Sequence, residues 1–210
     1  AMKQIGNIAQ AISENNILAN SPKASEWCPA FRSSILERYG NAHNFALIFN
    51  PSMQSSFAQD IERAIDGAAP TIRELLHAYE LEQLEVWMMA QIENLNNFAG
   101  VKQKMRINQM QELAGILLQK CQHLKATEIL LFFFKLKGGD FGGFYGVVDP
   151  QKVAEYFNVF IQWRREKFAI IQMKNEEMRR NHERKEWKQK CITRAQYEAS
   201  KRLKNANKDP

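Results

Sequence analysis

The sequence predicts an all-α fold: a multi-helix bundle with a long C-terminal helix that extends from its body. Apolar residues recur at intervals of three and four along most of the chain, which is the spacing of one helix face. No stretch alternates between apolar and polar residues as a half-buried strand would. After Pro150 no Gly or Pro occurs until Pro210, so nothing interrupts a helix there.

The first third of the chain is expected to form short helices. Apolar spacing that begins at Ile5 predicts one helix over 5–12, and similar spacing predicts others over 30–39 and 57–65. Residues 44–49 are a compact apolar piece between the last two. Gly40 and Gly67 are placed to end the second and third helices.

A capping box predicts where the next helix begins. Thr71 and Glu74 stand three residues apart, so each side chain can accept a hydrogen bond from the other residue's amide. The helical pattern continues to Gly100, with a break expected near Glu80. Its apolar residues are expected to lie in the core, namely Leu75, Leu76, Tyr79, Leu84, Trp87, Met88, Ile92, Leu95 and Phe98.

Two further helices are predicted, over 107–121 and from the candidate N-cap Thr127 to Gly138. The second contains the apolar run 129–134, and a helix without a polar face must be buried among its neighbours. The run could also be a buried strand, but the basic residues and the glycine after it favour a helix.

Five of the ten glycines lie in 138–146, among aromatic residues. The loop fits neither of two phosphate-binding patterns, G-x-x-x-x-G-K-S/T and G-x-G-x-x-G. We interpret it either as a tight turn that redirects the chain or as a partner-binding loop made of Gly139, Asp140, Phe141, Gly142, Gly143, Phe144, Tyr145 and Asp149. Asp149 and Pro150 are expected to begin the last helix, as N-cap and first helical residue.

Charge is distributed unevenly along the 210 residues, whose net charge is +6. Residues 1–100 hold six basic and eleven acidic side chains, whereas residues 164–210 hold fifteen basic and seven acidic ones. Because apolar contacts also thin out after Met173, we expect a helical bundle over 1–173 and a basic helical arm over 174–210. Such an arm is typical of proteins that meet a polyanion, either nucleic acid or an anionic membrane surface, although a solvated helix that serves solubility has the same pattern.

Several classes of protein are not indicated. The longest apolar run is far shorter than the roughly 20 residues of a membrane span, and no secretory signal is recognisable, so we expect a cytoplasmic protein. Cys28, Cys121 and Cys191 are as scattered as the four histidines, which predicts neither a disulfide framework nor a metal site.

No nucleophile stands beside a base in a recognisable motif, so the sequence predicts no catalytic residues, no cofactor and no enzyme. Glu82 and Glu85 share a helix face but have no histidine partner, and we interpret both as solvated charges.

The candidate nucleic-acid-binding residues lie on the last helix. Cations there would neutralise phosphates regardless of base sequence, and an aromatic side chain among them could stack on a base or lie at an interface. The set is Arg164, Arg165, Arg179, Arg180, Arg184, Lys185, Trp187, Lys188 and Lys190.

Four features of residues 105–168 occur together: Phe132-Phe133 in an aromatic helix, the loop Phe141-Gly142-Gly143-Phe144-Tyr145-Gly146, then Asp149-Pro150, and Trp163-Arg164-Arg165-Glu166. This part of the chain resembles an uncharacterised family of small helical proteins of bacterial phages and mobile elements. Asp140 stands where that family has a basic loop residue, which argues against phosphate binding by the loop. The resemblance implies a role in replication or maintenance of such elements and transfers no activity.

Two functional hypotheses follow. The first is a non-enzymatic, nucleic-acid-associated accessory protein whose binding is electrostatic and non-specific. The second is a protein-interaction adaptor, such as a loader or inhibitor of a replication enzyme, that uses the glycine loop and the acidic helix over 80–93. A homodimer is a further partner hypothesis, in which Trp187 packs against a second copy.

Overall fold

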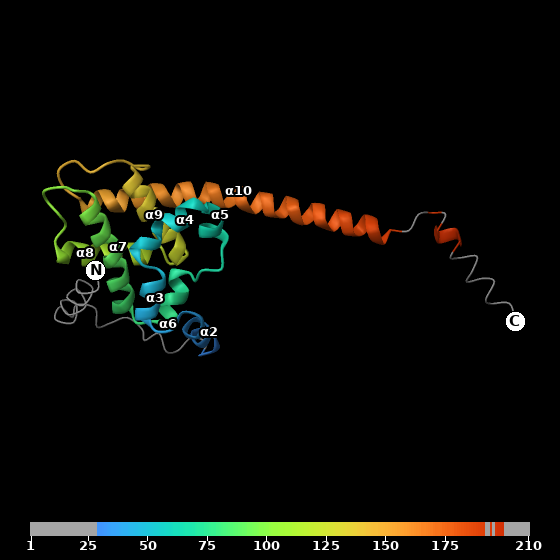
Figure 1. Cartoon of the computed structure of the whole chain (residues 1–210), viewed down its shortest axis with the longest axis horizontal. Coiled ribbons are helices and arrows are strands. Elements are labelled where there is room, and N and C mark those ends of the chain that lie inside the picture. The colour runs from blue at the N-terminus through green and yellow to red at the C-terminus, as the bar shows by residue number, and fades with distance from the viewer. Residues whose placement is uncertain (1–28, 192–193, 195, 200–210) are drawn as a thin grey trace. The chain divides into compact units, whose positions relative to one another are not determined.

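We analysed a computed structural model, which describes residues 29–191, 194 and 196–199. In these residues the fold is all-α and contains no β-strand, as predicted (Figure 1). The chain divides into two compact units, Ala1–Arg165 and Glu166–Pro210, with the boundary inside the last helix. The helix predicted over 5–12 lies outside the described residues, and the predicted boundary after residue 173 stays a prediction.

The first unit is built from short helices followed by longer ones. The short helices are α2 (Pro29–Tyr39), α3 (Ala42–Ile48), the 3₁₀ turn η2 (Pro51–Met53), α4 (Gln54–Gln59), α5 (Ile61–Asp66) and α6 (Ile72–Ala78). The longer ones are α7 (Leu81–Phe98), α8 (Ile107–Lys120), α9 (Ala126–Gly138) and the first turns of α10 (Pro150–Lys190). Among the described helices, none is long and apolar enough to cross a bilayer.

The predicted helix over 57–65 is in fact two helices. Asp60 separates α4 from α5 and caps α5, because its carboxylate accepts a hydrogen bond from the amide of Arg63 at 2.9 Å. The break expected near Glu80 is confirmed, since α6 ends at Ala78 and α7 begins at Leu81.

The four helices from α6 to α9 all begin with a capping-box arrangement, which sequence analysis recognised only at α6. The box at α6 is confirmed: the Thr71 amide donates to Glu74 Oε2 at 2.6 Å, and the Glu74 amide donates to Thr71 Oγ1 at 3.2 Å. At each of the other three helices, the third helical side chain accepts from the amide before the helix. These pairs are Gln83 with Glu80, Gln109 with Arg106, and Glu128 with Lys125.

The start of α9 differs from the prediction because the chain around it is paired with the start of α6. The amides of Ile72 and Arg73 donate to the carbonyls of Leu124 and Gln122, and the Ala126 amide donates to the carbonyl of Pro70. This pairing makes Lys125 the N-cap residue and Ala126 the first helical residue. The predicted cap Thr127 is therefore wrong. Its hydroxyl donates instead to the carbonyl of Ala64 at 2.7 Å and ties α9 to α5.

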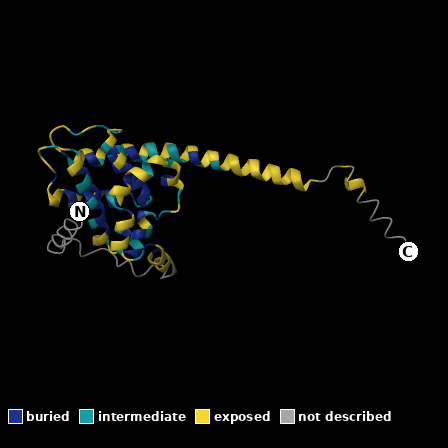
Figure 2. Cartoon of the chain, in the orientation of Figure 1, coloured by how far each residue is buried: buried dark blue, intermediate teal, exposed yellow. Residues whose placement is uncertain are grey.

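The core of the first unit is centred on α9, which packs against α4, α5 and α7. Its apolar run is a helix and is buried as predicted, apart from Phe134 (Figure 2). The ring of Phe132 lies 4.9–6.2 Å from the ring centroids of Phe133, Phe141, Phe157 and Phe160. Two of these rings belong to the first turns of α10, so aromatic packing attaches that part of α10 to the bundle.

Two predictions on α7 are wrong. Phe98 lies in the last turn of α7 and is 61% exposed rather than in the core; its ring lies 5.6 Å from Nζ of Lys137. Glu85, expected in solvent, is only 4% exposed. Its carboxylate lies against Gly115 of α8, where a Cβ would be 3.8 Å from Glu85 Oε1, an ordinary contact distance. Burial, and secondly the charge of Glu82, raise the pKa of Glu85.

Candidate nucleic-acid interface

The predicted binding residues on the part of α10 in the second unit are all exposed (Figure 2). Three of the cations are paired one turn away along the helix: Arg179 with Glu183 at 3.4 Å, Arg180 with Glu176 at 2.6 Å, and Lys190 with Glu186 at 3.2 Å. Exposed pairs of this kind contribute only about 0.3–0.5 kcal/mol, so a phosphate can replace the carboxylate at little cost.

Three other cations on the same part of α10 are not engaged in ion pairs with any described residue. Within the described part of the chain, Arg184, Lys185 and Lys188 form no ion pair. Trp187 is 70% exposed among them, and with Arg180, Glu183 and Arg184 it lines an open hollow on the helix surface. An exposed indole beside arginines is available for stacking on a base.

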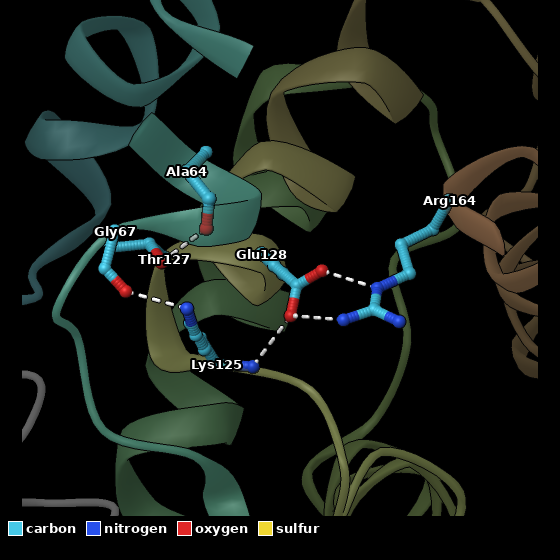
Figure 3. Close-up of polar contacts among 6 residues, drawn as sticks. All are labelled: Ala64, Gly67, Lys125, Thr127, Glu128 and Arg164. Carbon is cyan, nitrogen blue, oxygen red and sulfur yellow. Dashed lines mark hydrogen bonds and ion pairs between the residues drawn. The ribbon is translucent and has the colours of Figure 1, made fainter. Parts of the chain in front are cut away.

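Arg164 has a different role from its neighbours, because it pairs with a buried carboxylate (Figure 3). Its Nε donates to Glu128 Oε1 at 2.6 Å, and its side chain is 14% exposed while that of Glu128 is fully buried. Burial raises the pKa of Glu128, an effect opposed by Arg164 and by the Lys125 amide that donates to Oε2 at 2.8 Å. We therefore leave Arg164 out of the proposed phosphate contacts. The adjacent Arg165 is exposed.

The polar contacts in Figure 3 join several elements of the first unit. Lys125 Nζ donates to the carbonyl of Gly67, at the end of α5, at 2.5 Å. Lys125, Thr127 and Glu128 thus contact α5 or α10 from the start of α9. The pair with buried Glu128 therefore fixes the position of Arg164, and with it the position of the next residue, Arg165.

Two basic residues that sequence analysis missed lie where the chain before α9 pairs with the start of α6. Arg73 and His123 are exposed, and the antiparallel pairing of Thr71 with Lys125 places Arg73 opposite His123. Partial burial, followed by the charges of Arg164, Arg165 and Arg73, lowers the pKa of His123. These residues are far apart in the sequence and share no motif, so no sequence signal could have found them.

The glycine loop is held mainly by contacts within the first unit. Gly139 ends α9 with a positive φ of 81°, and Asp140 pairs with Lys135 at 2.5 Å. Gly142 has a φ of 133°, and a Cβ there would lie 2.6 Å from the hydroxyl of Tyr156, so only glycine fits without a shift. The Asp149 carboxylate accepts from the Gln151 amide at 2.8 Å, which confirms it as the cap of α10.

The aromatic residues of the loop divide into two kinds. The ring of Phe141 packs against those of Phe132 and Phe160, and the ring of Phe144 lies 5.8 Å from that of Tyr156. Tyr145 is 87% exposed, and Gly143 beside it is also exposed. Of the loop aromatics, Tyr145 is therefore the one available to a partner.

Lys137 of α9 is the centre of a separate, partly buried polar network. Its Nζ donates to Gln54 Oε1 at 2.7 Å and to the side-chain oxygen of Asn94. Gln54 in turn donates to Gln91, which donates to the carbonyl of Phe49. Burial lowers the pKa of Lys137 to about 8, and both acceptors of the amine are neutral amides.

This network predicts a pH dependence of stability. Between about pH 8 and the ordinary lysine value of 10.5, the unfolded chain retains a proton that folded Lys137 has released, so stability rises with pH. Burial raises the pKa of Cys121, and this lowers the stability as pH rises above about 9.

The effect of Lys137 is therefore isolated as a difference: the unfolding free energy of the natural chain minus that of Lys137→Met, measured from pH 7 to 10. We expect this difference to rise by about 1–2 kcal/mol, reduced by partial exposure of the amine. Lys152→Met, at an exposed site, controls for the loss of one lysine charge, and a difference for Lys137→Met that does not rise with pH would contradict the inference.

The fold and these side chains define an all-α helical bundle followed by a highly charged helix. Residues 104–209 match the family described as a family of unknown function, DUF6633, which is half of the chain. The chain belongs to this family. The matched region contains α8, α9, the glycine loop and α10, and thus Glu128 and Arg164, whereas Arg73 lies outside it. Comparisons with curated proteins and with solved structures gave no match.

Proposed function

We propose that this protein is a non-enzymatic accessory protein that binds nucleic acid non-specifically and serves the replication or maintenance of a mobile genetic element. The observation that carries the proposal is the set of exposed cations on α10, in particular Arg184, Lys185 and Lys188. Phosphate contacts by such side chains release counterions and supply most of the affinity of non-specific binding. The mobile-element role is supported by the sequence resemblance of residues 105–168.

The salt dependence of binding tests the proposal. The full chain should bind a 20-nucleotide single-stranded DNA at 50 mM salt, and about five phosphate contacts would weaken this binding by roughly 10²–10³-fold at 200 mM. Arg184→Gln, Lys185→Gln and Lys188→Gln together should reduce the slope of log affinity against log salt by about 2–3. Fluorescence anisotropy across the salt range measures both quantities.

A matched control removes three exposed cations elsewhere. Arg32→Gln, Lys102→Gln and Lys152→Gln change the net charge by the same amount on the first unit. If this control weakened binding as much as the triple variant at Arg184, Lys185 and Lys188, the part of α10 in the second unit would not be the binding surface. Absence of binding at 50 mM salt, or an affinity that does not respond to salt, would overturn the proposal.

An adaptor function is the second candidate, and exposed Tyr145 is the observation that favours it. Deleting the loop would remove Phe141 and Phe144 from their packing, so Tyr145→Ser is the better variant. The adaptor would be favoured if the natural chain captures a replication protein, Tyr145→Ser does not, and both bind DNA equally well. Unchanged capture would argue against it.

A further inference from the structure

Three elements of the first unit that carry basic side chains meet at the start of α9. Arg73 stands at the start of α6, His123 in the loop before α9, and Arg165 on α10. The Arg73 amide donates to the carbonyl of Gln122 at 2.9 Å, which fixes the α6 start beside His123. Arg165 follows Arg164, whose contact with Glu128 holds this turn of α10 against α9. The positions of all three residues are therefore set by hydrogen bonds of the bundle rather than by flexible chain.

Two acidic groups near this cluster already have partners, and Glu166, next to Arg165, is exposed. Glu128 is fully buried and pairs with Arg164, and Oε2 of Glu74 accepts the Thr71 amide. Lys125 directs its Nζ to the carbonyl of Gly67. Within the described residues, Arg73 and Arg165 form no ion pair, so their charges are available to an anion from outside.

We propose that Arg73, His123 and Arg165 form a binding site for one phosphodiester group of the nucleic-acid backbone. This inference rests on the proposed function and adds a contact on the first unit to those of α10. Two guanidinium groups supply charged donors suited to phosphate oxygens, and the imidazole adds a third donor. Arg164, held by Glu128, positions Arg165 and is not itself a ligand.

The site should couple binding to proton uptake. Partial burial, followed by the charges of three arginines, disfavours the protonated form of His123 in the free protein. A bound phosphate offsets those charges and favours the imidazolium. Affinity for nucleic acid should therefore increase as pH falls, and the pKa of His123 should rise when nucleic acid binds.

The experiment uses the full chain and a 20-nucleotide single-stranded DNA. The ring proton signals of His123, assigned with His123→Gln, are titrated by NMR between pH 5 and 8.5 with and without DNA. We expect DNA to raise the pKa of His123. The double variant Arg73→Gln and Arg165→Gln should reduce the salt slope of binding by about 1–2. The matched control, Lys102→Gln and Lys152→Gln, should leave that slope within about 0.5 of its original value.

The outcomes separate this inference from the proposed function. If the natural chain binds DNA but the pKa of His123 does not move, or the double variant behaves like its control, the phosphate site is wrong while DNA binding by α10 stands. If the natural chain does not bind DNA at 50 mM salt, both proposals are overturned. A circular dichroism melt of the double variant, expected within about 3 °C of the natural chain, shows that the fold is retained.

Discussion

Replacing Arg164 with Met should lower the free energy of unfolding by about 3–5 kcal/mol. The substitution leaves the Glu128 carboxylate, which is fully buried, without its charged partner at 2.6 Å. Removal of one member of a buried pair costs far more than loss of a surface pair, because the remaining charge must be desolvated or protonated. Urea unfolding monitored by circular dichroism at pH 7 measures the change.

Two variants control this experiment. Arg165→Met changes the next residue in the same way, but its side chain is exposed, so a loss below about 0.5 kcal/mol is expected. Glu128→Gln combined with Arg164→Met removes both charges and should be more stable than Arg164→Met alone. An Arg164→Met protein as stable as Arg165→Met would show that the buried pair does not stabilise this bundle.

Replacing Phe132 with Ala should be similarly costly, at about 3–5 kcal/mol. Phe132 is fully buried and lies at the centre of four other rings, so truncation leaves a cavity between α9, α10 and the glycine loop. Because Phe141 of that loop packs on Phe132, amide exchange over residues 139–146 should also become faster. Urea unfolding and hydrogen exchange give the two readouts.

The same substitution two residues later provides the control. Phe134 belongs to the same helix and the same apolar run, but it is 40% exposed. Phe134→Ala should cost less than about 1.5 kcal/mol, since only part of its surface is removed from water on folding. Equal losses at Phe132 and Phe134 would contradict the arrangement of the core.

Much of the fold could be predicted because its signals are local. The capping box at Thr71, the break near Glu80 and the N-cap Asp149 depend on residues two to four positions apart. The apolar run of α9 indicated its central position, because a helix without a polar face has no stable place at a surface. Predictions were wrong where a side chain bonds to a residue far away in the sequence. Thr127, for example, is not a cap because its hydroxyl donates to α5.

The candidate site was predicted less completely. The cations of α10 beyond Arg165 could be selected from charge alone, and their side chains are exposed. Arg164 and Arg165 look equivalent in the sequence, yet one pairs with buried Glu128 and the other is exposed. Their difference arises because consecutive residues of a helix point about 100° apart, and only the packed bundle decides which direction faces the interior.

By itself, the sequence determined the helical class, several limits of the longer helices and the uneven distribution of charge. Helix limits follow from interactions within one or two turns, and charge follows from composition. Only the tertiary structure decided that Glu85 is buried, that Phe98 is exposed, and that the elements carrying Arg73, His123 and Arg165 meet at the start of α9. These outcomes depend on contacts between residues tens of positions apart, which are set by how the helices pack and not by the local pattern of any one of them.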